Sequence, residues 1–247
     1  MKKLYIILFL IAGTLVSCIK EDTTANVSRI TNYPIITVNG PSFLIVNEGS
    51  NYVDAGAVST EDGNEIETIT SFGNGTYFGT PGVDTSTPDQ YLITYSAQNA
   101  DGFSGSALRE VWVAPPAGDL KTSISGLYTS SVQRAPLFAP SAKYNDLEFV
   151  FIIQTGANTY KLSHAIGGYY GMGRGYGPGY IAAGAVITAN DIATNDFTIS
   201  QATFPIWGNT VDVSEFTVDS GTKTITFTGN GNFGNGTFKV QLKQVEL

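Results

Sequence analysis

Residues 83–99 read VDTSTPDQYLITYSAQN, and this stretch decides the fold class of the N-terminal half of the chain. Tyr91, Ile93 and Tyr95 occupy alternate positions within it. Because successive side chains of a β-strand point to opposite faces of its sheet, this alternation predicts a half-buried antiparallel strand. Pro88 predicts the turn that precedes the strand.

Similar short runs recur along the chain, rich in Val, Ile, Thr, Tyr and Phe and separated by Gly, Asn, Asp and Pro. The mature chain has no sustained apolar pattern at the i, i+3, i+4, i+7 spacing of an amphipathic helix. The last run, TFKVQLKQV, alternates Phe238, Val240 and Leu242 with polar residues, as expected of a strand with one wet face. These runs predict an all-β protein.

The segment APPAGDL, residues 114–120, divides the chain near its middle. Pro115 and Pro116 cannot continue a sheet ladder, and the Gly and Asp that follow favour a short extended linker. We therefore expect two β domains, at residues 33–114 and 119–247.

The first domain resembles the bacterial immunoglobulin-like domain of surface and adhesion proteins. The resemblance covers nearly all of residues 33–113 and includes the segment VDTSTPDQY. It implies an immunoglobulin-like β-sandwich and almost nothing about a ligand. The other motif positions are Ile36, Thr37, Val38, Asn39, Gly40, Val46, Gly49, Tyr52, Asp54, Gly56 and Ala57.

The second domain resembles the C-terminal domains of Bacteroides-type surface lipoproteins, which commonly accompany glycan-uptake systems. The resemblance rests on ISGLYTSSVQR, residues 124–134, and on the later segment YKLSHAIGGYYGMGRGYG, residues 160–177. It implies either an antiparallel β-sandwich or a lipocalin-like barrel.

The N-terminus predicts export and lipid anchoring. Lys2 and Lys3 precede a short apolar stretch, so residues 1–17 are expected to be a signal peptide. The sequence LVSC resembles a lipobox that ends at Cys18, the one cysteine of the chain. An ordinary secretion signal with an incidental cysteine is the alternative. Residues 18–32 are expected to be a lipidated tether, and the segment KED, residues 20–22, resembles the export signal of Bacteroides-type surface lipoproteins, which implies an outer-membrane, cell-surface location.

Composition argues against several kinds of partner. The formal net charge is −8, and no run of Lys or Arg is present, so nucleic acid is not an expected partner. No acidic run has the spacing of a calcium loop, and His164 is the sole histidine. We expect neither a metal nor a cofactor, and we expect turn capping by the aspartates, which include Asp54, Asp62, Asp84, Asp89 and Asp101.

No catalytic signature is present, and the chain is not expected to be an enzyme. The GFSGS segment lacks the spacing of a nucleophile elbow, and GNGNFG lies between two expected strands instead of opening a helix. A glycosidase-type carboxylate pair stays open as an alternative. The candidates in the second domain are Asp146, Glu148, Asp191, Asp196, Asp212, Glu215 and Asp219.

The segment GGYYGMGRGYGPGYIAAG, residues 167–184, supplies the candidate binding site. If residues 170–180 are extended, one face carries aromatic side chains and Arg174, and the other carries glycine. Sugars stack on aromatic rings, so these rings either bind a glycan or complete the core. The candidates are Tyr169, Tyr170, Arg174, Tyr176, Tyr180 and Trp207.

These features predict a non-catalytic surface lipoprotein whose second domain binds an oligosaccharide or a protein of an outer-membrane uptake complex. The immunoglobulin-like domain is expected to act as a spacer. A structural or adhesive protein that acts through protein–protein contacts is the alternative.

Overall fold

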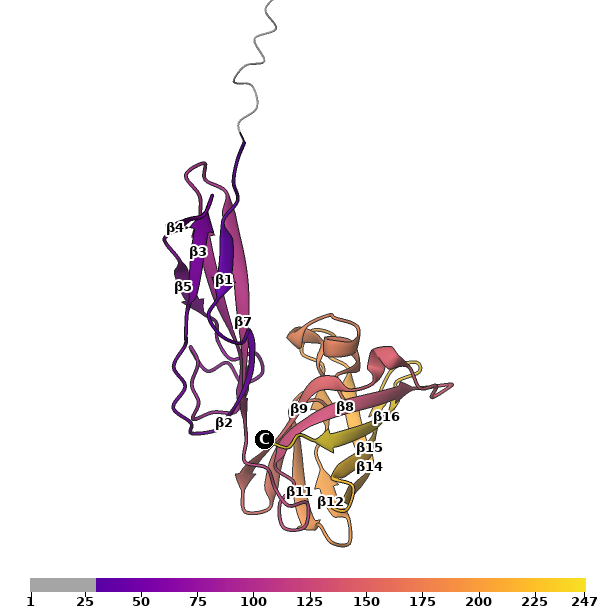
Figure 1. Ribbon diagram of the computed structural model, residues 1–247. Helices are drawn as coiled ribbons and strands as arrows, with labels where there is room; N and C mark the ends of the chain where they lie inside the picture. The colour runs from indigo at the N-terminus through magenta and orange to yellow at the C-terminus, as the bar shows by residue number, and fades with distance from the viewer. Residues whose placement is uncertain (1–29) are drawn as a thin grey trace, which may run out of the picture.

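The computed structural model describes residues 30–247 (Figure 1). The expected signal peptide, Cys18 and the tether as far as residue 29 lie outside the described residues. The described chain consists of strands and three short helical turns, which confirms the all-β prediction. Within this part of the chain, no helix is long and apolar enough to cross a bilayer.

Seven strands form the first domain as two packed sheets of order β1-β3-β4 and β2-β7-β6-β5. Every pairing is antiparallel except that of β2 with β7. The predicted alternation holds in β6, where Tyr91, Ile93 and Tyr95 are fully buried. This arrangement confirms the immunoglobulin-like sandwich. The strands are β1 (Ile35–Val38), β2 (Phe43–Asn47), β3 (Ala57–Glu61), β4 (Asn64–Ile66), β5 (Ile69–Phe72), β6 (Asp89–Gln98) and β7 (Ser104–Ala114).

A buried ion pair ties the two sheets of this domain together. Arg109 of β7 is 1% exposed, and its guanidinium contacts the carboxylate of Asp54. The hydroxyl groups of Tyr95 and Tyr52 also donate to Asp54 Oδ1, at 2.7 and 3.0 Å. Burial alone would raise the pKa of Asp54, but these hydrogen bonds and Arg109 outweigh it and lower the pKa.

Nine strands form the second domain as one antiparallel sheet of order β12-β11-β10-β9-β8-β16-β15-β14-β13. Three short helical turns, η1 (Ala142–Tyr144), η2 (Tyr169–Gly173) and η3 (Pro178–Tyr180), lie in its connections. The strands are β8 (Gly126–Arg134), β9 (Leu147–Gly156), β10 (Thr159–Leu162), β11 (Ala185–Asp191), β12 (Asp196–Ile199), β13 (Ala202–Thr203), β14 (Thr210–Asp219), β15 (Thr224–Gly231) and β16 (Thr237–Gln244).

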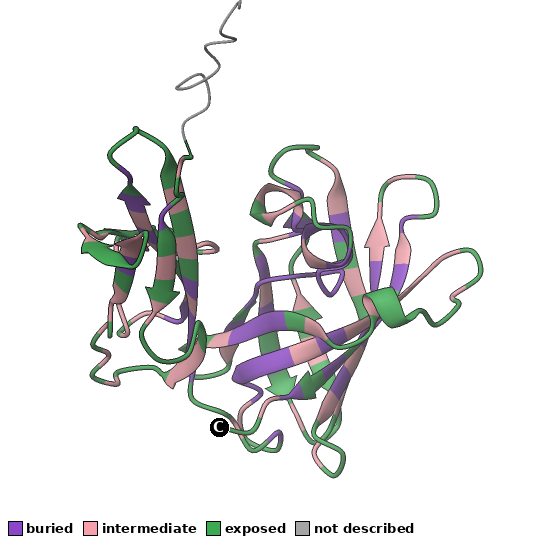
Figure 2. Cartoon of the chain, turned by 45° about the horizontal axis from the view of Figure 1, so that its top comes forward, coloured by how far each residue is buried: buried purple, intermediate pink, exposed green. Residues whose placement is uncertain are grey.

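The second sheet curls until its two ends meet. Phe197 of β12 packs against Phe216 of β14, with ring centroids 4.8 Å apart. Buried and exposed residues alternate along the strands (Figure 2), as they do in β16, where Phe238, Val240 and Leu242 face inward. Of the two predicted arrangements, the structure has the curled, barrel-like sheet and not a sandwich of two facing sheets.

The two domains pack directly against each other. Trp112 of β7 lies against Phe149 and Phe151 of β9, with ring centroids 5.0 and 5.3 Å away. Tyr77 from the first domain contacts Phe151 and His164, at 5.8 and 5.1 Å. The outer face of the curled sheet therefore supplies one wall of an aromatic core that both domains share.

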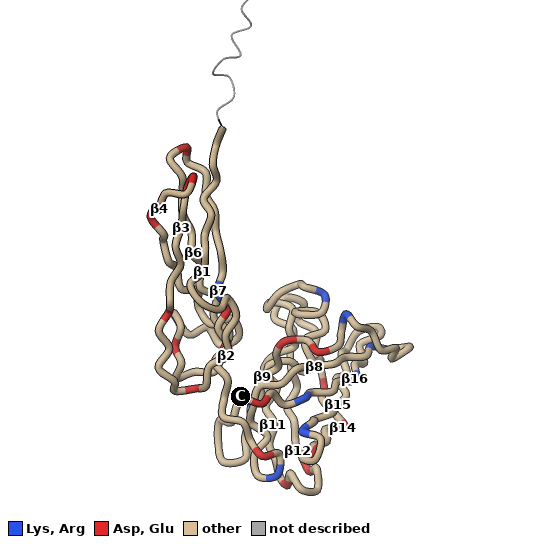
Figure 3. The backbone as a smooth tube through the Cα atoms, in the orientation of Figure 1, with Lys and Arg blue, Asp and Glu red and all other residues tan. Residues whose placement is uncertain are grey.

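The two domains differ in charge. Between residues 30 and 114 there are ten acidic residues, and the single basic residue is the buried Arg109. Lys and Arg side chains lie mainly on the second domain (Figure 3). The charged side chains on the surface of the first domain are therefore acidic.

Candidate functional site

Residues 164–184, called the plug segment below, do not form the expected strand. The segment instead contains two short helical turns, η2 over Tyr169–Gly173 and η3 over Pro178–Tyr180, joined by residues 174–177. Gly168, Gly175 and Gly177 have φ values of 79°, 70° and 87°, which are incompatible with an extended strand. The prediction of an extended two-faced segment is wrong, because glycine adopts these left-handed conformations at little cost.

The plug segment fills the interior of the curled sheet at one end. A Cβ added to Gly167 would lie 2.5 Å from Ser130 Oγ and 2.7 Å from Val132 and Val240, on the inner faces of β8 and β16. Small barrels of the lipocalin type hold a ligand in this space. Here the chain itself occupies it, so we place the candidate site at the surface.

Tyr169 and Tyr170 belong to the core. They are 6% and 9% exposed, and their rings pack on Phe238 at centroid distances of 5.1 and 5.9 Å. The guanidinium carbon of Arg134 lies 5.6 and 5.5 Å from their ring centroids, within cation–π range. These two rings were expected either to bind a glycan or to complete the core, and in the structure they pack in the core.

Tyr176, Tyr180 and Trp207 form a surface cluster with Arg174, called the aromatic patch below. Trp207 reaches it from the β13–β14 connection, where Gly208 N donates to Phe204 O. The ring of Trp207 lies 4.9 Å from that of Tyr180 and 6.3 Å from that of Tyr176, in edge-on contacts. Tyr176 and Trp207 are 45% and 42% exposed.

Arg174 joins the aromatic patch to Tyr144, a residue that the sequence patterns did not single out. Its guanidinium carbon lies 5.9 Å from the Tyr176 ring centroid, and its Nη1 donates to Tyr144 Oη at 3.4 Å. The ring of Tyr144 stacks on Tyr169 at 4.3 Å. All six predicted residues therefore lie in one connected cluster, with Tyr169 and Tyr170 buried at its base, Tyr180 half-buried, and the other three exposed.

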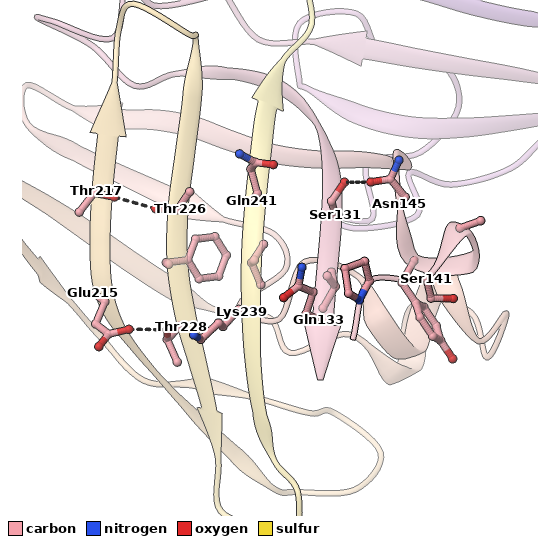
Figure 4. A pocket seen from close by; sticks show the side chains of 16 residues that line it. Ser131, Gln133, Ser141, Asn145, Glu215, Thr217, Thr226, Thr228, Lys239 and Gln241 are labelled. Atoms are coloured by element: carbon pink, nitrogen blue, oxygen red, sulfur yellow. Dashed lines mark hydrogen bonds between the residues drawn. The ribbon is translucent and has the colours of Figure 1, made fainter. Parts of the chain in front are cut away.

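An open groove of about 720 Å3 begins beside Tyr144 and runs over the outer face of the curled sheet (Figure 4). Its floor is polar, and the loop that contains η1 forms one wall. The lining residues are Ser131, Val132, Gln133, Pro140, Ser141, Ala142, Tyr144, Asn145, Glu215, Thr217, Thr226, Phe227, Thr228, Lys239, Val240 and Gln241. The sequence does not indicate this groove, because its side chains resemble those of any solvated strand face.

The carboxylates that were candidates for a catalytic pair do not converge in this groove. Glu215 is the one carboxylate among its lining residues, and its Oε2 accepts from Thr228 Oγ1 at 2.7 Å. Asp191 and Asp219 cap turns by accepting from backbone amides at 2.9 and 2.8 Å. Glycoside hydrolysis by the usual route requires two flanking carboxylates, and this groove supplies one.

Metal-binding side chains are also dispersed. Within residues 30–247, no three His, Cys, Asp or Glu side chains are placed to share a metal ion. In the first domain, Asp84 caps a turn through Ser86 N at 2.9 Å, and Asp89 accepts from the amides of Tyr77 and Phe78 at 2.8 Å each. His164 is fully buried, and burial lowers its pKa to about 3.

Comparison with known proteins gives matches to both domains. A family model for a C-terminal domain matches residues 117–244, just over half of the chain. A second model, described as bacterial surface protein, Ig-like domain, matches residues 36–113. The curated proteins give no match.

One solved structure, that of the lipoprotein BT2262 from Bacteroides thetaiotaomicron, is similar over both domains. The sequence identity is 25% and the TM-score is 0.60. The likeness covers 86% of this chain and 100% of that chain.

Proposed function

Since the chain belongs to the surface lipoprotein family whose C-terminal domain model matches residues 117–244, we propose that it binds a glycan at the cell surface through its aromatic patch. The single observation that carries this proposal is the convergence of Tyr176, Tyr180 and Trp207 from separate turns, with Tyr176 and Trp207 exposed and Tyr180 half-buried. Sugar rings present apolar C–H faces, which stack on aromatic rings of this kind.

Arg174 adds hydrogen-bonding capacity at the same place. It is exposed, and its planar guanidinium presents donors beside the ring of Tyr176. An apolar stacking surface with a polar rim is the chemistry that a sugar needs, with its apolar faces and hydroxyl edges. The buried Tyr169 and Tyr170 support the patch from below and fix its shape.

The rest of the chain fits a role in presenting this site. A lipid on Cys18 would hold the protein at the outer membrane, and proteins of an uptake complex would be its partners there. The described chain begins at the end of the first domain farthest from the second domain (Figure 1). The immunoglobulin-like domain would therefore hold the aromatic patch away from the anchor.

Neither the family nor the similar lipoprotein is a known type of enzyme, and we propose that this protein binds without catalysis. The groove beside the patch contributes one carboxylate, which agrees with a binding role. A glycan incubated with the protein should therefore be recovered intact.

Affinity electrophoresis against a panel of polysaccharides tests the proposal. We expect retardation in at least one gel, and we expect Trp207→Ala to reduce it because the largest stacking surface is removed. Tyr33→Ala is the matched control, since Tyr33 is an exposed aromatic residue (60%) of the first domain. If no polysaccharide retards the wild-type protein, glycan binding is wrong.

A structural or adhesive role is the second candidate, and one observation favours it. The outer face of the β2-β7-β6-β5 sheet exposes Ile69, Leu92 and Leu108 (58%, 38% and 54%), and β5 forms an open edge of that sheet. Exposed strand edges and apolar patches are common sites of protein association. Retardation in no gel, together with concentration-dependent self-association, would favour this role.

A further inference from the structure

We infer that the aromatic patch and the outer groove form one extended site for a neutral oligosaccharide, joined through Arg174 and Tyr144. This inference rests on the proposed function and specifies its ligand as a chain of several sugar units. The patch alone would hold only part of such a chain.

A continuous series of contacts leads from the patch to the groove. Trp207 lies 6.3 Å from Tyr176, and the guanidinium carbon of Arg174 lies 5.9 Å from the Tyr176 ring centroid. Arg174 Nη1 in turn reaches Tyr144 Oη at 3.4 Å, and Tyr144 lines the groove. A ligand that leaves the aromatic patch over Arg174 therefore meets the groove next.

The wall of the groove is fixed in place. The loop between β8 and β9 folds back over the sheet, where Ser131 Oγ donates to Asn145 Oδ1 at 2.6 Å. Asp146 N donates to Ser131 Oγ at 3.3 Å, and Tyr144 stacks on Tyr169 from the same loop. A preformed hollow binds a ligand without the cost of ordering its wall.

The floor of the groove consists of two polar rows that cross four adjacent strands (Figure 4). Neighbouring strands are about 4.8 Å apart, so each row spans about 14 Å. A chain lying across the strands meets polar side chains at each strand, which suits a repeating series of hydroxyl groups. One row contains Thr217, Thr226, Gln241 and Ser131, and the other contains Glu215, Thr228, Lys239 and Gln133.

The charge of the groove favours a neutral ligand. Glu215 and Lys239 are the charged residues among its lining, and their charges are opposite. The remaining polar lining consists of hydroxyl and amide groups, which both donate and accept hydrogen bonds as sugar hydroxyls do. The volume of about 720 Å3 lies within the range of about 300–1,000 Å3 that is usual for ligand pockets.

Isothermal titration calorimetry with oligosaccharides of two lengths tests the inference. The probes are the disaccharides and hexasaccharides of the cello-, malto-, manno- and xylo- series. For the series that binds, the hexasaccharide should bind the wild-type protein about tenfold more tightly than the disaccharide, because it gains several hydrogen bonds in the groove. In Gln133→Ala/Gln241→Ala, this gain should fall to about twofold while disaccharide affinity stays unchanged.

Lys161→Ala/Thr188→Ala is the matched control, because these exposed residues of β10 and β11 lie outside the groove. It should keep the full gain with length. Trp207→Ala should weaken the binding of both lengths, since it removes part of the patch.

Each contrary outcome has a separate meaning. A full length gain in the groove variant, or no length gain in the wild-type protein, overturns the extended site and leaves the patch intact. Binding that Trp207→Ala does not change overturns the proposed function of the patch. Tighter binding of an oligogalacturonate of the same length overturns the neutral class of ligand. If none of the oligosaccharides binds, the extended site is wrong, and retardation by the polysaccharide panel decides the proposed function separately.

Discussion

Asp54 neutralises the one buried cation of the first domain, so its removal is expected to destabilise that domain. We predict that Asp54→Asn lowers the free energy of unfolding by about 3 kcal/mol, since Arg109 is then buried without a counter-charge. Urea denaturation measures this change. Asp62→Asn, at an exposed turn, should leave the stability nearly unchanged, and an equal loss in both variants would contradict the prediction.

The same carboxylate makes stability depend on acid. The pKa of Asp54 is lowered in the folded state, so its contribution is complete above the ordinary value near 3.8 and is lost as the pH falls through the lower folded pKa. Stability measured from pH 4.5 downward should therefore fall less steeply in Asp54→Asn than in the wild-type protein. Parallel curves for the two proteins would rule this out.

Burial of His164 leads us to predict a second pH dependence of stability, at higher pH than that of Asp54. Burial lowers its pKa to about 3, so between pH 6.5 and that value the unfolded chain binds a proton that the folded chain does not. The contribution of His164 to the free energy of unfolding is complete above pH 6.5, and it falls by about 2 kcal/mol on acidification to pH 5. Tyr77, whose pKa burial raises, stays neutral throughout.

Urea titrations at pH 7 and pH 5 measure the contribution of His164. In His164→Leu the difference between the free energies of unfolding at pH 7 and pH 5 should be smaller by about 2 kcal/mol, because leucine does not titrate. A difference as large as that of the wild-type protein would show that His164 is not its source.

At the scale of the element, the plug segment depends on glycine for two separate reasons. Gly167 and Gly175 both have positive φ, 61° and 70°, so alanine is strained at either position. A Cβ would meet Ser130 and Val132 at Gly167 but open space at Gly175. We predict that Gly167→Ala costs about 1–3 kcal/mol more than Gly175→Ala, because overpacking adds to the strain. Thermal unfolding tests this, and equal losses would contradict it.

The strands could be predicted from the sequence because the alternation of apolar and polar residues indicates which face of a strand is buried. Tyr91, Ile93 and Tyr95 in β6, and Phe238, Val240 and Leu242 in β16, lie buried as predicted. The prediction for the plug segment was wrong because glycine at alternate positions has the period of a strand, while some of these glycines adopt a positive φ. Residue types alone do not distinguish the two cases.

The residues of the aromatic patch were chosen from the sequence, and the groove beside them was not. Tyr176, Tyr180 and Trp207 were chosen for their residue type and their neighbouring turns, and contacts between distant turns bring them together. Tyr144 lies in a polar loop, and Gln133 and Gln241 occupy wet positions of ordinary strands. Only the curl of the sheet and the folded-back loop make these residues line a hollow.

At the scale of the whole molecule, the predicted resemblance to bacterial surface lipoproteins with an immunoglobulin-like domain is confirmed. The domain boundary and the lipid on Cys18 stay predictions. The sequence did not reveal that the two domains share a core, because Trp112 and Phe151 lie on strand faces that each domain alone would expose.

The shared core predicts that the two domains unfold together. Trp112→Ala removes the central ring, and we expect a loss of about 3–5 kcal/mol and the separation of one calorimetric transition into two. Leu108→Ala, on the exposed part of the same strand face, should keep one transition. Two separate transitions in the wild-type protein would contradict this coupling.

The central claim, glycan binding at the aromatic patch, is tested most directly by the fluorescence of Trp207. The chain has two tryptophans, and Trp112 is 1% exposed whereas Trp207 is 42% exposed, so an external quencher reports mainly on Trp207. Titration with the soluble polysaccharides of the electrophoresis panel should, for at least one of them, produce a saturable change in emission and protect Trp207 from acrylamide. Unchanged emission and unchanged quenching with every polysaccharide would contradict the claim.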